Sequence, residues 1–277
     1  MSFAVLATLL GVGAVVGLAS GLLGIGGGVL IVPFLYLFYA RPDWSGASVP
    51  PSLQAVVAHA TSLAVILPTA MHGTIDQHRA GRVLWRAALP IGIASSAGAV
   101  VGASVAARLP APLLKLAFGV VLVGAAANLV RTSTAHARQH ERVSALVTIP
   151  IGLAIGVFSA VLGVGGGIIA IPLLIYVVGL DVERVAATSL AIISLAAVAG
   201  VVTYMVRGAG VAGLPAFSVG YVHLFAALPI LLGSLLLVRR GTALNRRLDA
   251  RLLRVIFALL FVALGIRLIA LNLGALR

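Results

Sequence analysis

The sequence predicts an all-α membrane protein, a polytopic helical bundle of two inverted repeats. Each repeat is expected to contain a glycine-broken re-entrant helix hairpin and three full spans. The 277 residues are 61% hydrophobic and only 9% charged, with a mean hydropathy of +1.19, which lies outside the range of soluble domains. Apolar runs of membrane-spanning length cover most of the chain. One glycine-rich segment occurs twice, 139 residues apart.

The duplicated segment extends over residues 17–35 and again over residues 156–174, with nine of nineteen positions identical. The identities include a glycine triplet and a proline five residues after it, Pro33 or Pro172. Shorter matches follow, such as Ala-Thr-Ser-Leu-Ala at 60–64 and again at 187–191. A repeat of this kind indicates two copies of one structural unit.

The apolar runs define the expected elements. The first repeat, residues 1–138, is predicted to contain a hairpin over 3–40 and spans over 53–71, 87–107 and 112–130. The second repeat, residues 139–277, is predicted to contain a hairpin over 143–179 and spans over 184–206, 220–238 and 252–274. Strand-like alternation is absent from these runs, so helices rather than a β-barrel satisfy the backbone in lipid.

Each hairpin is inferred from a short run that follows the glycine triplet. The runs 29–40 and 168–179 would extend about 18 Å, too little to cross a bilayer alone. Two arrangements are open: a re-entrant hairpin with both ends on one side, or one broken span that crosses. The hairpin places thirteen of the nineteen basic residues on one side, whereas the crossing span divides them about ten to nine. Because basic loops stay in the cytoplasm, the hairpin is favoured.

A hairpin and three spans together cross the membrane an odd number of times, so the second repeat starts on the side opposite to the first. The second repeat is therefore predicted to be inverted, and both termini are predicted to be extracytoplasmic. The same basic loops account for the net charge of +13, and no nucleic-acid partner is expected. The predicted partners are the lipid bilayer and a small anion, and the sequence predicts no oligomeric state.

Other classes of chemistry find little support in the sequence. The chain has no cysteine, which excludes disulfides and thiolate sites. His136 and His140 have i, i+4 spacing without a third ligand, so no metal site is predicted. His-Glu-x-x-His and Gly-x-Ser-x-Gly motifs are missing, and the six acidic residues fall between the apolar runs. We expect neither an enzyme nor a cofactor.

The two glycine clusters are the predicted binding elements. They lack the Lys-Ser/Thr of a phosphate loop and the spacing of a dinucleotide fold. Each opens a helix whose first N–H groups have no intrahelical partner, and these donors, at the positive end of the helix dipole, can bind an anion. Close helix packing is the alternative interpretation of such small-residue spacing. The predicted substrate-binding glycines are Gly24, Gly26, Gly27, Gly28, Gly163, Gly165, Gly166 and Gly167.

Hydroxyl side chains near the glycine clusters are further candidates for the site. Thr61 and Ser62, and their counterparts Thr188 and Ser189, occur in both repeats and can donate to an anion; the alternative is a bond to the carbonyl one helical turn earlier. Ser20 and Ser159 precede the glycine clusters and are weaker candidates.

His59 is the one candidate for proton coupling, because it lies in a span and titrates near neutral pH. Its counterpart is Ala186, and a lone histidine in a span is more often a hydrogen-bonded packing residue. His72 and His223 lie near span ends and are expected to face the membrane interface.

The doubled Gly-Leu-Leu-Gly-Ile-Gly-Gly-Gly…Pro element and the Ala-Thr-Ser-Leu repeat resemble the sulfite exporter TauE/SafE family, also called the four-toluene sulfonate uptake permease family. The resemblance covers essentially the whole chain. It implies a multi-pass protein of the bacterial inner (cytoplasmic) membrane that moves sulfite, sulfonates, sulfoacetate or related organic anions. It further implies that the glycine clusters, with Pro33 and Pro172 as structural residues, form two substrate loops.

These observations favour a secondary transporter that holds its anion at the membrane midplane between two glycine-rich half-helix N-termini. A passive anion channel is the nearest alternative. A membrane assembly protein without transport activity is a more distant one.

Overall fold

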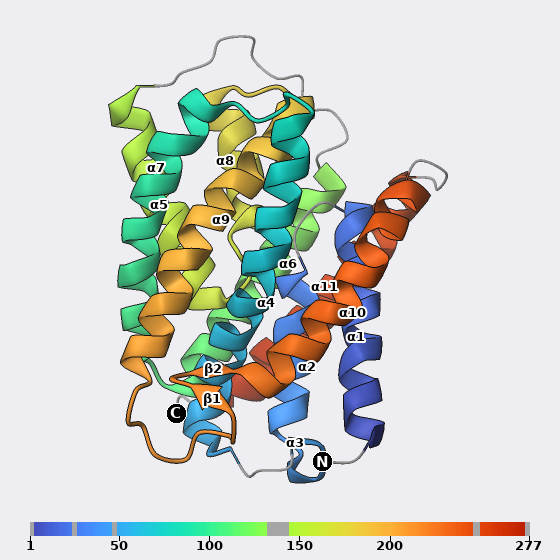
Figure 1. Cartoon of the computed structure of the whole chain (residues 1–277), viewed down its shortest axis with the longest axis vertical. Helices are drawn as coiled ribbons and strands as arrows, with labels where there is room; N and C mark the ends of the chain where they lie inside the picture. Colours follow the sequence, from blue (N-terminus) through green and yellow to red (C-terminus); the bar gives the residue numbers. More distant parts are fainter. Residues whose placement is uncertain (1–2, 24–26, 46–48, 132–143, 246–249, 275–277) are drawn as a thin grey trace.

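The computed structural model describes residues 3–23, 27–45, 49–131, 144–245 and 250–274 (Figure 1). The first half contains α1 (Phe3–Leu23), α2 (Gly28–Tyr39), α3 (Pro42–Ser45), α4 (Pro51–Arg79), α5 (Trp85–Ala106) and α6 (Ala111–Arg131). The second half contains α7 (Ala145–Leu162), α8 (Gly167–Leu173), the π-helix η2 (Leu174–Val178), α9 (Val182–Arg207), β1 (Ser218–Val219), β2 (Val222–His223), α10 (Leu224–Asn245) and α11 (Ala250–Leu273).

The predicted all-α polytopic class is confirmed. Within the described ranges, seven helices are long and apolar enough to cross a membrane, and three shorter apolar stretches accompany them, at Gly28–Tyr39, Gly167–Val178 and Leu224–Val238. The central pair of helices, α4 and α9, is the most buried of the seven. These two helices therefore form the axis around which the others pack.

The helices run between two ends of the molecule (Figure 1). We call the end where α1 begins and α11 finishes the terminal end, and the end that carries Arg79, Arg82 and Arg184 the basic end. Helix α1 rises from the terminal end and α2 returns to it, so the two helices run antiparallel (Figure 1). Helix α7 begins at the basic end instead (Figure 1).

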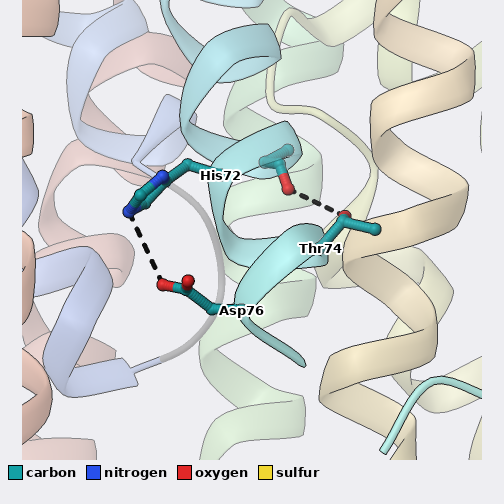
Figure 2. Close-up of polar contacts among 4 residues, drawn as sticks. His72, Thr74 and Asp76 are labelled. Atoms are coloured by element: carbon teal, nitrogen blue, oxygen red, sulfur yellow. Dashed lines mark hydrogen bonds and ion pairs between the residues drawn. The ribbon is translucent and has the colours of Figure 1, made fainter. Parts of the chain in front are cut away.

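Helix α4 is longer than the predicted span of 53–71, because it continues to Arg79. Its 29 residues extend about 44 Å, more than the hydrocarbon core, so polar residues can prolong the helix beyond the lipid. Asp76 therefore lies on a helix and not in a loop, paired with His72 (Nε2–Oδ2 3.5 Å). Figure 2 shows this pair on one side of α4 and the contact between Thr74 and Ser194 (Oγ1–Oγ 3.1 Å) on the side facing α9.

The predicted span 220–238 begins four residues late, at Leu224. Residues 218–223 form a small antiparallel hairpin in which Ser218 pairs with His223 and Val219 with Val222. Its turn contains Gly220, whose φ of +55° suits glycine. Two strands of two residues each have too few side chains for an alternating pattern, which is why the sequence did not indicate them.

Helix contacts recur at the spacing of the sequence repeat. Helix α1 packs on α10, and α7 packs on α5. A Cβ on Gly13 would meet the backbone of Ile230, and a Cβ on Gly152 would meet Ile91; both partners are related by the offset of 139. Glycine at these positions allows the helix backbones to approach closely, which is the packing role expected of such spacing.

The α4–α9 contact is reciprocal in the same way. A Cβ on Gly200 would lie 2.6 Å from Leu63 Cδ2, and a Cβ on Gly73 would lie 3.1 Å from Leu190 Cδ1. Each residue of the first contact corresponds to one of the second at an offset of 127, the spacing of the Ala-Thr-Ser-Leu repeat. Equivalent surfaces of α4 and α9 therefore face each other.

Candidate functional site

The two glycine clusters meet in the interior of the bundle. A Cβ on Gly28 would lie 2.7 Å from Val164 Cα and 2.9 Å from the carbonyl oxygen of Gly163, so the first cluster lies directly against the second. Ile66 of α4 contacts both clusters, because its side chain would lie 2.6 Å from a Cβ on Gly28 and 2.8 Å from one on Gly165. The junction therefore sits beside the central helix α4. Gly24 and Gly26 lie outside the described residues.

The second cluster folds into a turn that requires glycine. Gly163 ends α7 with a φ of +66°, and Gly165 and Gly166 follow at +75° and +77°. Gly166 is the N-cap of α8, and no side chain caps that helix start. The first bonded amides are those of Ile169 and Ala170, which donate to the carbonyl of Gly166 at 3.0 and 2.7 Å. The amides of Gly167 and Ile168, which come before them, have no acceptor within the helix.

The first cluster presents a similar helix start with a different backbone. Gly27 is the N-cap of α2 in a right-handed conformation (φ −70°), again without a side-chain cap. The amides of Leu30 and Ile31 donate to the carbonyl of Gly27, both at 3.1 Å. The amides of Gly28 and Val29 are thus the first-turn donors of α2. Two uncapped helix starts are therefore present at the junction.

Both predicted structural prolines lie inside the half-helices. Pro33 is a buried residue of α2, and Pro172 lies in α8 two residues before the helix widens into η2. Proline cannot donate a backbone hydrogen bond and displaces the carbonyl one turn earlier, so each proline weakens its half-helix on the side of the glycine cluster. The π-turn η2 follows Pro172 only, since α2 continues as a regular helix to Tyr39 after Pro33.

Ser62 and Ser189 are equivalent in sequence but differ in their surroundings. The buried Ser62 hydroxyl donates to the carbonyl of Gly163 at 2.7 Å, which ties α4 to the second glycine cluster. The hydroxyl of Ser189 is also buried and has no hydrogen-bond partner in the described part of the chain. Of these two serines, only Ser62 forms a hydrogen bond that stabilises the junction.

We expect Ser62→Ala to lower the free energy of unfolding by about 1 kcal/mol or more, because the buried Gly163 carbonyl would lose its donor. Ser189→Ala is the matched control and should leave the stability close to that of the wild type. Thermal unfolding of both variants in detergent measures the difference. Equal loss of stability in the two variants would contradict this assignment.

Thr61 and Thr188 have matching backbone partners. The Thr61 hydroxyl accepts the amide of His223 at 3.1 Å, and the Thr188 hydroxyl accepts the amide of Leu84 at 3.2 Å. Leu84 and His223 are themselves 139 residues apart, and each immediately precedes a long helix, α5 or α10. Both threonines therefore satisfy a helix start, and their contact with an anion stays a prediction.

Ser159 lies beside the second helix start. A Cβ on Gly166 would lie 3.1 Å from Ser159 Cβ, and the Ser159 hydroxyl is buried without a hydrogen-bond partner among the described residues. Its counterpart Ser20 is half-buried in α1. A buried hydroxyl without a partner next to uncapped amides is a donor available to a ligand.

His59 is a buried, hydrogen-bonded residue. Its Nε2 atom forms a hydrogen bond with the hydroxyl of Tyr36, and its ring stacks on Phe118 with centroids 6.0 Å apart. Its backbone lies against the second glycine cluster, since a Cβ on Gly163 would be 2.6 Å from His59 Cα. These contacts describe a packing role, and proton coupling through His59 stays a prediction.

The sequence suggested that His223 faces the membrane interface, and this prediction is wrong. It is buried, and its Nδ1 atom lies 3.1 Å from the hydroxyl of Tyr39. The β1–β2 hairpin turns the side chain inward against α2, a long-range placement that proximity to a span end does not reveal.

Sequence reasoning missed the two tyrosines, Tyr36 and Tyr39. They are three residues apart in α2, so they share a face of that half-helix. The equivalent positions of the second repeat are Ile175 and Val178. This difference between otherwise similar repeats was the signal that could have identified them.

Metal binding finds no support in the described ranges, which hold no group of three or more potential ligands close enough to share an ion. His136 and His140 lie outside those ranges.

Known proteins resemble the chain over nearly its full length. The family described as sulfite exporter TauE/SafE matches residues 9–268. A probable membrane transporter protein of Haemophilus influenzae is 28% identical over 255 residues, covering 92% of this chain and 94% of the relative. One of Methanocaldococcus jannaschii is 27% identical over 265 residues, covering 92% of each chain, and YunE of Bacillus subtilis is 25% identical over 287 residues, covering 97% and 98%. No solved structure matches significantly.

Proposed function

Because the chain belongs to the sulfite exporter TauE/SafE family, we propose that it is a secondary transporter of a small sulfur-containing or organic anion. Sulfite, sulfonates and sulfoacetate are the class of cargo, and the bacterial inner membrane is the proposed location. The family's probable membrane transporter relatives support transport rather than catalysis.

One observation carries the anionic assignment: the uncapped start of α2 lies against Gly163 and Val164 of the second glycine cluster, and the uncapped start of α8, in that same cluster, lies beside a buried serine hydroxyl that lacks a partner among the described residues. The amides at each start and the positive ends of the two helix dipoles favour a negative ligand. Low dielectric surroundings strengthen this preference, because water competes poorly for the donors. The proposed site comprises both glycine clusters with Ser159 and Ser189.

The recurring contacts support a mechanism in which two inverted repeats move around a fixed site. Equivalent faces of α4 and α9 are in contact beside the glycine junction. A rocking motion about this contact would expose the site to one side and then to the other. At a membrane potential of about 100 mV, negative inside, export of one unit charge would gain about 2.3 kcal/mol, so no coupling ion is required for export.

Counterflow in proteoliposomes tests the proposal. Proteoliposomes that contain the purified protein are loaded with unlabelled sulfite, thiosulfate, sulfoacetate or taurine. The labelled anion is then added outside, and its accumulation inside the vesicles is measured. A secondary transporter gives saturable counterflow with at least one of these anions. Flux that does not saturate and reaches channel rates would favour a passive anion channel. Absence of both flux and ligand-induced stabilisation across the panel would favour an assembly protein.

The proposed orientation predicts sided labelling of engineered cysteines, which the cysteine-free chain makes simple to measure. Arg82→Cys, in the exposed turn before α5, should react only from the cytoplasm. Ala209→Cys, in the exposed turn after α9, should react only from the opposite side. Labelling of intact cells with a membrane-impermeant maleimide distinguishes the two, and reaction of Arg82→Cys from outside would refute the orientation.

A further inference from the structure

A basic side chain lies inside the bundle near the proposed site, on a helix that the site itself does not use. Lys115 is the fifth residue of α6, and its Nζ atom lies 5.5 Å from the ring centroid of Tyr36. The side chain is half-buried, whereas Arg267, a basic residue in the middle of α11, is exposed. Snorkelling toward the interface explains an exposed cation in a span, but it does not explain one that lies over an internal aromatic ring.

Among the described residues, Lys115 has no acidic partner. The ion pair found in the described part of the chain joins His72 to Asp76, and no carboxylate there pairs with Lys115. A cationic side chain within a span is costly, and such residues usually mark a route or a site for charged substrates. An unpaired cation has a field that is free to act on an anion.

Contacts connect Lys115 to the glycine junction. Its neighbour Tyr36 packs edge-on against Phe118 (5.9 Å between centroids) and forms a hydrogen bond with His59. The backbone of His59 lies against Gly163. Tyr36 follows Gly28 by eight residues, about 12 Å of helix. Lys115 therefore lies between the junction and the terminal end, roughly two helical turns along α2 from the first helix start.

The repeat supplies a second observation. Residues 111–118, Ala-Pro-Leu-Leu-Lys-Leu-Ala-Phe, align with residues 250–257, Ala-Arg-Leu-Leu-Arg-Val-Ile-Phe, at the offset of 139. Four of the eight positions are identical, and Arg254 occupies the position of Lys115. Each is the fifth residue of the last helix of its repeat, and α6 and α11 pack against each other. A basic residue at this position is thus a feature of both repeats.

We propose that Lys115 forms an anion-binding subsite, with Tyr36 and His59 behind it, that receives the substrate at the terminal end before or after it occupies the glycine junction. The ligand is the same small oxyanion, so this inference rests on the proposed function. Lys115 would raise the local concentration of anions on one side only, because it lies between the junction and that side. Arg254 holds the equivalent sequence position in the second repeat.

The test measures transport kinetics from each side separately. Lys115→Gln and Lys115→Arg are reconstituted, and sulfite uptake is measured in two vesicle preparations with opposite orientation; if the wild type transports another anion of the panel instead, that anion is the probe. Removal of the charge should raise KM by about tenfold for substrate presented at the terminal end, with kcat and the opposite-side KM nearly unchanged. Lys115→Arg should restore the wild-type KM.

Arg108→Gln is the matched control, since Arg108 is an exposed basic residue at the same end, in the turn just before α6. It removes the same charge outside the route and should leave KM unchanged. Equal KM values for Lys115→Gln and wild type, or a rise of KM on both sides, would overturn the subsite. So would failure of Lys115→Gln and the apolar, chain-length-matched Lys115→Met to fold, because that result assigns Lys115 to stability. Absence of transport in the wild type would instead refute the proposed function.

Discussion

Replacing Gly166 with valine is expected to abolish anion transport while the protein remains folded. Gly166 has a φ of +77°, a conformation that β-branched residues avoid. Its Cβ would lie 3.1 Å from Ile155 Cγ2 and from Ser159 Cβ, on the side where the unpartnered serine hydroxyl lies. A valine side chain would therefore occupy the space beside the uncapped amides of α8. We expect the counterflow rate to fall by about a hundredfold or more, since misplacing a binding group by about 1 Å can have this effect.

Gly210→Val separates the loss of the site from backbone strain. Gly210 has nearly the same φ, +78°, but a Cβ there would meet no atom within 4 Å. This variant carries a similar conformational cost in an exposed turn and should transport at a rate close to that of the wild type. If Gly166→Val retained half of the wild-type rate, or if both variants lost transport equally, the anion site could not lie at the glycine junction.

Replacing Gly156 with leucine should instead lower stability. A Cβ at this position would lie 2.7 Å from the backbone nitrogen of Ala99, so α5 and α7 would have to move apart. Overpacking of this kind costs about 1–3 kcal/mol, and we expect the upper part of that range because the obstacle is backbone and cannot change rotamer. Gly17→Leu should behave in the same way, since a Cβ there would lie 2.6 Å from Ser234 Cα.

Thermal unfolding in detergent measures this effect, with Gly11→Leu as the control. Gly11 is an exposed residue of α1, and a Cβ there would meet nothing within 4 Å. Leucine at position 11 should be neutral or slightly stabilising, because leucine favours helix more than glycine does. If Gly156→Leu unfolded at the wild-type temperature, the close contact between α5 and α7 would be disproved.

The sequence by itself determined the class of the protein, its duplication and the positions of the two interrupted helices. Hydropathy is a local property that sums along a segment, so the long apolar helices were evident without any knowledge of their neighbours. Glycine permits the positive φ values at Gly163, Gly165 and Gly166 but does not determine them, since Gly27, the counterpart of Gly166, has a φ of −70°.

The ends of helices and the hydrogen-bond partners of polar side chains could not be predicted from hydropathy. Helix α4 continues eight residues beyond the predicted span because polar residues end a hydrophobic run without ending a helix. The dipeptide Thr-Ser occurs in the same motif of both repeats, at 61–62 and at 188–189. Both threonine hydroxyls accept the backbone amide of a distant helix start, whereas the Ser62 hydroxyl donates to a glycine carbonyl.

Only the tertiary structure decided which of these groups meet. The contact between Gly28 and Gly163, the bond between Ser62 and Gly163, and the position of Lys115 over Tyr36 each join segments far apart in the chain. Composition and periodicity describe one segment at a time. The satisfaction of a buried polar atom depends on packing between segments. For that reason the partner of Ser62, the lack of one at Ser189 and the position of Lys115 over Tyr36 could be read only from the folded protein.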